Sequence, residues 1–196
     1  EDVKSVIIRM NTPGGDVIAS DLIGKTVENM KKPVVVSMSD TCASGGYWIA
    51  CGADHIVAHA LSVTGSIGVF SGKFVVKGLL DKLGIHVLDG GGFGSPFSSW
   101  TENQKHSHQK SLDYIYEEFQ NRVMLNRDID PESIDMVAEG RVWTGTMAQE
   151  LNLIDSIGGY EKSIQIAKKL ADIDENTPVQ IIDYQNQKSL KEKLYE

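Results

Sequence analysis

The chain has 196 residues, of which 41% are hydrophobic and 23% are charged, so it is long enough to bury the core of one globular domain without disulfides or metals. Its net charge of −8 and the lack of a basic run interleaved with aromatic residues argue against a nucleic-acid-binding surface. No apolar stretch is long enough to span a bilayer, and no signal peptide is present.

The first half of the chain alternates between predicted strands and helices. Asp16 or a neighbour caps a helix with one apolar face, and Lys31-Lys32-Pro33 ends it. Short apolar and β-branched runs flank that helix and continue beyond it, which predicts parallel βαβ units. The predicted strands are 6–10, 34–38, 56–58, 67–70 and 85–88, with a helix around 74–83.

The second half is predicted to be mostly helical. A glycine-rich segment, 89–101, cannot pack a core and is expected to be a mobile surface loop. Asp130-Pro131 is a helix-start signal, and Thr144 is expected to cap another helix. The predicted helices are 101–126, one starting at 130, one around 148, and 160–171, followed by an edge strand at 179–182. We expect one domain, 1–183, and a polar tail, 184–196.

A candidate nucleophile lies where the second predicted strand ends, in Ala43-Ser44-Gly45-Gly46-Tyr47-Trp48. A serine between a buried strand and a helix is held with its hydroxyl exposed, and the amides of the following turn can stabilise an oxyanion. The Gly-x-Ser-x-Gly pattern of a nucleophile elbow is absent, because Cys42 occupies the first glycine position. A glycine-rich turn with an incidental serine is the alternative interpretation.

A second turn, Pro13-Gly14-Gly15-Asp16, follows the first predicted strand and supplies another potential oxyanion donor, the amide of Gly15. The two turns together resemble signal peptide peptidase A, a serine protease family that shares the Clp protease/crotonase fold. Thr64-Gly65-Ser66-Ile67-Gly68-Val69 and two later motifs, 139–145 and 151–158, extend the resemblance, which covers residues 3–170.

The resemblance implies an α/β fold made of repeated β-β-α units, with a mostly parallel sheet and C-terminal helices. It also implies that Ser44 is the nucleophile, that the amides of Gly15 and Gly45 form the oxyanion hole, and that Ser66 orients a catalytic lysine. A lysine serves as general base only when burial and its neighbours lower its pKa. The activity implied is cleavage of apolar peptides such as signal-peptide remnants.

The general-base lysine is missing from its expected place. In short family members it follows the Leu-Gly-Ile strand, a slot that falls near Ser95 and Pro96, and no lysine occurs between Lys82 and Lys105. Long family members carry the lysine in an N-terminal half and the serine in a C-terminal half, which this chain resembles. We therefore expect the base to lie outside this chain, and the isolated chain to be nearly inactive.

Other candidates carry weaker signals. No motif places His55, His59, His86, His106 or His108 beside Ser44, and none of these residues has metal-ligand spacing. Cys42 and Cys51 fit neither a disulfide framework nor a zinc pattern and are expected to be small buried hydrophobes. We expect no metal and no cofactor. Arg141, Trp143 and Asp155 are interpreted as structural, and Phe93 and Phe97 as an apolar lip or a subunit contact.

Two other function classes remain open from the sequence. A crotonase-like acyl-CoA enzyme shares the fold but needs acidic catalytic residues and has no use for Ser44. A non-catalytic structural or oligomerisation half is the other alternative. For the peptidase, the resemblance implies a peptide substrate, a homo-oligomer, no nucleic acid, and a location on the extracytoplasmic face of the membrane, with any anchor lying outside this chain.

Overall fold

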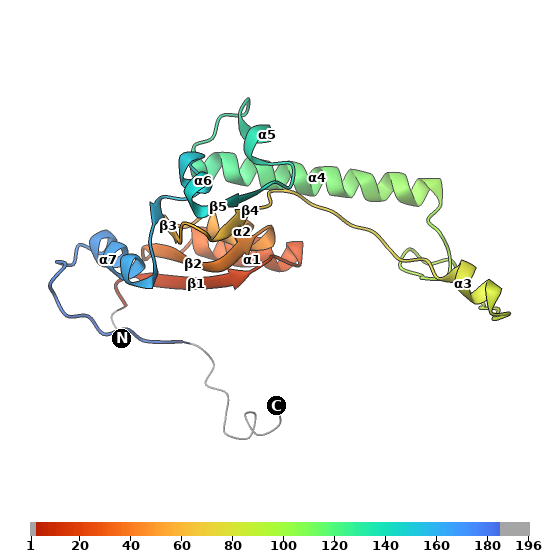
Figure 1. Ribbon diagram of the computed structural model, residues 1–196, viewed down its shortest axis with the longest axis horizontal. Coiled ribbons are helices and arrows are strands. Elements are labelled where there is room, and N and C mark those ends of the chain that lie inside the picture. The colour runs from red at the N-terminus through yellow and green to blue at the C-terminus, as the bar shows by residue number, and fades with distance from the viewer. Residues whose placement is uncertain (1–2, 185–196) are drawn as a thin grey trace, which may run out of the picture.

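The computed structural model describes residues 3–184. Within them the chain forms a six-stranded sheet, ordered β5-β4-β2-β3-β6, with β1 pairing on β2. All pairs are parallel except β4 with β5. The mixed α/β architecture with a curled, mostly parallel sheet confirms the predicted fold class (Figure 1). The strands are β1 Val6–Thr12, β2 Val34–Ala43, β3 His55–Ala58, β4 Val63–Gly65, β5 Val142–Thr144 and β6 Ser156–Ile157.

Three of the helices within residues 3–184 begin at a side-chain cap. Asp16 accepts a hydrogen bond from the Ala19 amide at the start of α1, and Thr101 forms a capping box with Gln104 at the start of α4. The Thr144 side chain accepts a hydrogen bond from the Met147 amide and so caps α6. The helices are α1 Val17–Glu28, α2 Gly45–Ala50, α3 Lys77–Lys82, α4 Glu102–Arg127, α5 Ile134–Val137, α6 Gly145–Glu150 and α7 Tyr160–Leu170.

The central strand β2 is buried on both faces, as expected for a parallel sheet covered by helices. Val34, Val36 and Met38 point into the main core, which also holds Trp48 of α2 and residues of α1 and α4. Val35 points to the opposite face, where it packs with residues of α7. The sheet therefore lies between two helical layers, and α2, which follows Ser44 directly, is enclosed in the larger one.

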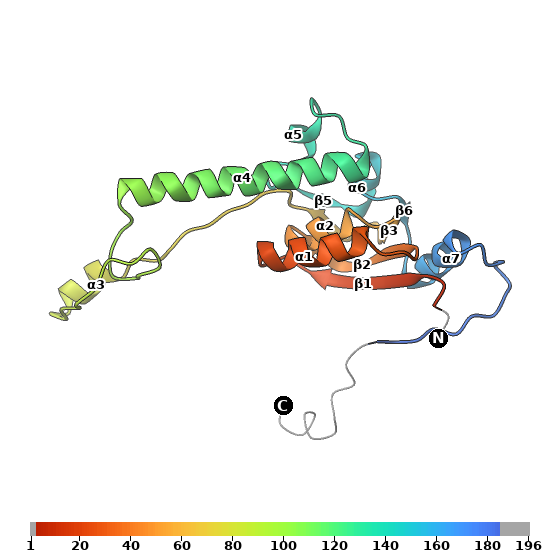
Figure 2. The ribbon, with the colours of Figure 1, turned by 180° about the vertical axis from the view of Figure 1, so that it is seen from behind.

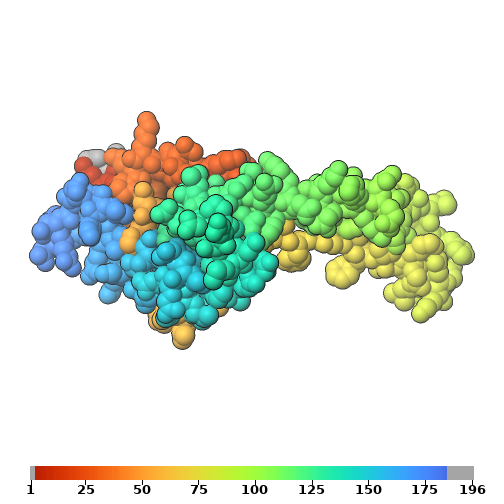
Figure 3. Space-filling model, turned by 90° about the horizontal axis from the view of Figure 1, so that it is seen from above, coloured from red at the N-terminus to blue at the C-terminus, as the bar shows by residue number. Residues whose placement is uncertain are grey.

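Residues 70–100 form an arm that extends from the body beside the N-terminal end of α4 (Figures 2 and 3). Segment 89–101 is a largely exposed loop without helix or strand, as expected, and side-chain contacts hold it within the arm. The rings of Phe93 and Trp100 stack with centroids 5.0 Å apart, and His108 of α4 contacts both rings. Lys73 donates hydrogen bonds to the Phe93 and Ser95 carbonyls and lies 5.5 Å from the Trp100 ring centroid. An aromatic cluster thus ties the arm to α4.

Several sequence predictions were wrong in their details. The runs 67–70, 85–88 and 179–182 are not strands, and the helix expected around 74–83 is reduced to α3. The helix expected from residue 130 is the short α5. Segment 85–88 lies in the arm, where no neighbouring strand supplies hydrogen bonds. It therefore does not form a strand despite its β-favouring residues. Most of the predicted polar tail lies outside the described residues, and no helix within 3–184 is long and apolar enough to cross a membrane.

Candidate active site

Ser44 lies at a sharp turn between β2 and α2. Its backbone is in a positive-φ conformation (φ 51°, ψ −122°) that a non-glycine residue rarely adopts, which is typical of functional turns. Its amide donates to the Gly65 carbonyl at 2.9 Å, and its carbonyl accepts from the Trp48 amide at 2.9 Å, so both neighbouring elements hold the turn. The Ser44 hydroxyl makes no hydrogen bond to any described residue and is partly exposed. The hydroxyl is therefore accessible and not engaged by another described side chain.

The Pro13-Gly14-Gly15 turn lies directly against the Ser44 turn. A Cβ atom on Gly14 would lie 2.8 Å from the Ala43 carbonyl oxygen, from the Gly45 nitrogen and from Ser44 Cβ, and Gly14 has φ +111°. A Cβ atom on Gly45 would lie 3.2 Å from the Gly15 nitrogen. Only glycines permit this approach of two backbones.

The amides of Gly15 and Gly45 make no hydrogen bond to any residue between 3 and 184. Gly45 is the first residue of α2, where an amide has no partner within its own helix. Acyl-transfer enzymes use unpaired backbone donors close to the nucleophile to stabilise a tetrahedral oxyanion, so these two amides have the location expected of the predicted oxyanion hole.

Ser66 lies beside Ser44 because of the sheet register. In the parallel pairing of β2 with β4, Cys42 is opposite Thr64 and Ala43 is opposite Gly65, so the next positions, Ser44 and Ser66, leave the sheet at the same edge. Ser66 also has a positive φ, of 50°, and its hydroxyl makes no hydrogen bond within the described part of the chain. The two serines predicted from separate motifs are thus brought together.

The turn that precedes β5 holds Ser66 in place. The Ser66 amide donates to the Arg141 carbonyl at 2.7 Å, and the Gly140 amide donates to the Ile67 carbonyl at 2.9 Å. The Arg141 guanidinium donates to the Ala138 carbonyl at 3.3 Å and to the Glu139 carboxylate, which tightens this turn. Motif 139–145 is structural, as expected, and it buttresses the site.

No lysine hydrogen-bonds to Ser44 or Ser66 in the region 3–184. Lys73, which follows Ser66 closely in the chain, is held in the arm by two carbonyls and the Trp100 ring. Lys77 pairs instead with Asp81 within α3. Ser95 and Pro96, at the expected lysine slot, also lie in the arm.

The two thiols are poor nucleophiles. Both are buried, and burial raises the pKa of each to about 12, so both are protonated at neutral pH. Among the histidines, His55 is engaged with Ser156 at 2.8 Å, on a different strand pair from Ser44. Residues 3–184 contain no group of three His, Cys, Asp or Glu side chains that could hold a metal ion.

Sequence reasoning missed the bulge at Asn11, whereas it anticipated that Tyr47 packs the nucleophile helix rather than contacting substrate. The pairing of β1 with β2 shifts register between Met10 and Thr12, and the Asn11 side chain accepts a hydrogen bond from the Thr41 amide at this bulge. Tyr47, fully buried, donates its hydroxyl to the Leu153 carbonyl at 2.8 Å and fixes α2 to the 151–158 motif. The polar pair Asn11-Thr12, directly before Pro13-Gly14-Gly15, is the only sequence feature that could have indicated the bulge.

The paired turns and the partly exposed serine have the arrangement expected for the nucleophile region of a serine peptidase, and comparison with known proteins identifies a peptidase family. The model of peptidase family S49 matches residues 27–174, and the chain belongs to this family. Family membership favours the peptidase interpretation over the crotonase-like one.

Several longer proteins are similar to the chain. It is 37% identical over 188 residues to the chloroplastic serine protease SPPA of Arabidopsis thaliana. The aligned region covers 92% of this chain and 28% of that protein. It is 36% identical over 186 residues to Protease 4 of Haemophilus influenzae, with 91% of this chain and 30% of that protein aligned. It is also 36% identical over 180 residues to putative protease MJ0651 of Methanocaldococcus jannaschii, with 88% of this chain and 58% of that protein aligned. The chain thus spans less than two thirds of each relative.

Proposed function

We propose that this domain is the nucleophile-bearing part of a serine endopeptidase with a Ser/Lys dyad. One observation carries the proposal: the Ser44 turn and the Pro13-Gly14-Gly15 turn lie in backbone contact, next to a serine hydroxyl and two amides that have no hydrogen-bond partner among residues 3–184. Membership of family S49 supports the same activity.

In the proposed mechanism, Ser44 Oγ attacks the carbonyl carbon of the scissile peptide bond and loses its proton to a neutral amine. The negative charge that develops on the carbonyl oxygen is stabilised by the Gly15 and Gly45 amides. Collapse of this intermediate expels the leaving amine, which takes the proton from the general base, and leaves an acyl-enzyme on Ser44. A water molecule then hydrolyses the ester by the same steps. The Ser66 hydroxyl orients the amine without adding charge.

The general base in this proposal comes from outside the chain. A serine hydroxyl needs a proton acceptor within about 3 Å, and Lys73 is engaged elsewhere. The isolated domain should be nearly inactive towards an apolar peptide ester. Activity should appear when a lysine-bearing N-terminal half is present in the same polypeptide, and should vanish when that lysine is replaced by alanine. Hydrolysis by the isolated domain that is lost on Lys73→Ala would refute the split dyad.

The proposed substrates are apolar peptides, such as remnants of signal peptides, at the extracytoplasmic face of the membrane. The Enterococcus faecium relative named putative signal peptide peptidase SppA, 33% identical over 192 residues, supports this substrate class. The direct test compares full-length wild-type enzyme with Ser44→Ala on an apolar and a charged peptide of equal length. We expect Ser44→Ala to abolish cleavage without changing thermal stability, and the charged peptide to be cleaved more slowly.

A fluorophosphonate probe separates this proposal from a purely structural role. A serine made nucleophilic by a neighbouring base reacts covalently with the probe. Labelling of full-length wild-type enzyme at Ser44, and none of Ser44→Ala, is the expected result. If the full-length wild-type protein is not labelled at Ser44, the domain is a non-catalytic half.

A further inference from the structure

The peptide bond between Gly14 and Gly15 has an unusual position in the site, because its two ends have different roles. Its N–H belongs to Gly15 and is the proposed oxyanion donor, whereas its C=O belongs to Gly14. Gly14 and Gly15 both have positive φ angles, 111° and 155°. Two consecutive glycines leave such a peptide unit free to rotate, so something else must fix which way its N–H points.

The Thr12 hydroxyl contacts both backbone polar groups of Gly14, the N–H and the C=O. The Gly14 amide donates to Thr12 Oγ1 at 3.1 Å, and the Thr12 hydroxyl donates to the Gly14 carbonyl at 3.4 Å. One hydroxyl can serve both bonds, since it carries one proton and two lone pairs. A planar trans peptide points its N–H and C=O in opposite directions, so a carbonyl directed at Thr12 directs the Gly15 N–H away from Thr12.

Thr12 also contacts the nucleophile turn. It is the last residue of β1 and pairs with Cys42 of β2, two residues before Ser44. Its methyl group fills the space where a side chain on Gly46 would lie, since a Cβ atom there would be 2.7 Å from Thr12 Cγ2. The polar side of Thr12 thus holds one turn and its apolar side packs on the other.

We propose that Thr12 is a positioning residue for catalysis: its hydroxyl fixes the orientation of the Gly14–Gly15 peptide so that the Gly15 amide points at the developing oxyanion. The inference rests on the proposed function. The backbone bulge at Asn11 contributes by turning Thr12 towards the glycines, with the freed Thr41 amide satisfied by the Asn11 side chain.

The test uses full-length enzyme with Thr12→Val, Thr12→Ser and Thr12→Cys. Valine keeps the shape but removes both hydrogen bonds, serine keeps the hydroxyl but loses the methyl group, and a thiol is a weak donor and acceptor. Loss of an oxyanion-hole donor costs about 10²–10³ in kcat, and a misdirected donor retains part of its effect. We expect kcat per titrated Ser44 to fall about 10–100-fold in Thr12→Val and less in Thr12→Cys, with KM unchanged and Thr12→Ser within about threefold.

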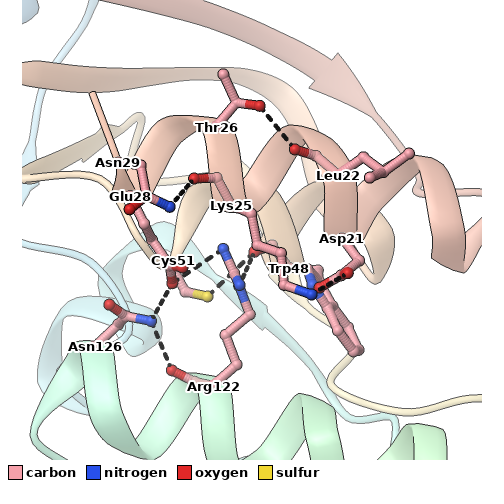
Figure 4. A network of polar contacts seen from close by, with 10 residues as sticks. All are labelled: Asp21, Leu22, Lys25, Thr26, Glu28, Asn29, Trp48, Cys51, Arg122 and Asn126. Atoms are coloured by element: carbon pink, nitrogen blue, oxygen red, sulfur yellow. Dashed lines mark hydrogen bonds and ion pairs between the residues drawn. The ribbon is translucent and has the colours of Figure 1, made fainter.

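A substrate pair gives a readout that loss of stability would not change. An ester and its thionoester differ only in the atom that enters the oxyanion hole, so the ratio of their rates reports how well the amides fit oxygen. The rate of ester hydrolysis divided by the rate of thionoester hydrolysis should fall in Thr12→Val and Thr12→Cys and stay at the wild-type value in Thr12→Ser. Thr26→Val is a matched control, since the exposed Thr26 hydroxyl also donates to a carbonyl, that of Leu22 at 2.8 Å (Figure 4), and it should leave kcat and the ratio unchanged.

Two outcomes overturn the inference. In one, a folded Thr12→Val or Thr12→Cys enzyme shows wild-type kcat and rate ratio. In the other, Thr12→Ser is impaired as much as Thr12→Val, which would assign the effect to the methyl contact with Gly46. Failure of the proposed function is a distinct result, in which Ser44→Ala retains ester hydrolysis and no oxyanion hole is in use.

Discussion

Arg122 should be the main polar contact between α4 and the nucleophile helix α2. We expect Arg122→Met to lower the free energy of unfolding more than the loss of any exposed ion pair would. Its side chain is only 9% exposed. Nε donates to the Trp48 carbonyl at 2.9 Å, near the C-terminal end of α2. Nη2 lies 3.0 Å from Glu28 Oε1, an ion pair without the alignment of a hydrogen bond. Figure 4 shows Arg122 reaching from α4 towards α1 and α2.

The size of the loss follows from what Arg122→Met leaves behind. A hydrogen bond to a charged group contributes about 1.5–3 kcal/mol, and removing one partner of a buried ion pair costs about 3–5 kcal/mol. The Glu28 side chain is 28% exposed and keeps a hydrogen bond from Asn126, so the lower end applies. We expect the free energy of unfolding to fall by about 3 kcal/mol, which for a domain of this size lowers Tm by about 6–12 °C.

Differential scanning calorimetry of wild type and Arg122→Met measures this directly. Lys105→Met is the matched control on the same helix, because the Lys105–Glu102 pair is exposed on both sides and should not change Tm measurably. A second variant, Gly24→Ala, tests the same contact from α1, since its Cβ would lie 2.5 Å from Arg122 Nη2. Equal Tm values for wild type and Arg122→Met would refute the assignment of Arg122 as an anchor.

The remaining predictions concern pH, thiols and assembly. Burial lowers the pKa of His55 below 6.5, so stability should fall as pH decreases through 6.5, and His55→Asn should flatten that slope in thermal melts. Cys42 and Cys51 should resist iodoacetamide at pH 8 and react only in denaturant, because burial raises both pKa values to about 12. Self-association through the arm predicts that Phe70→Asp and Phe74→Asp, at residues 97% and 92% exposed, reduce the sedimentation coefficient of the full-length protein. A strictly monomeric wild type would contradict the last prediction.

Local sequence signals determined much of the framework. The β-branched run at 34–36, the caps at Asp16 and Thr101 and the apolar spacing of α4 act over a few residues, so the elements could be predicted without knowledge of their neighbours. The glycine turns at Gly14 and Gly45 were also recognisable, because a backbone turn that excludes side chains requires glycine in the sequence itself.

Other features arose only in the folded chain. Short strands such as β5 and β6 exist because β4 and β3 supply their hydrogen bonds, and segment 85–88, with a comparable apolar pattern, has no such neighbour in the arm. The clustering of Phe93 with Trp100 and His108 likewise needed the arm to fold back on α4.

The candidate site shows the same division. The sequence determined which residue types could do the chemistry, since Ser44, Ser66 and the two glycine turns are each readable as local motifs. Only the tertiary structure placed them together: the parallel register of β2 with β4 brings Ser66 beside Ser44, and the bulge in β1 brings Thr12 and Gly15 against Gly45 and Gly46. Register depends on pairing between segments distant in the chain, and no local pattern encodes it.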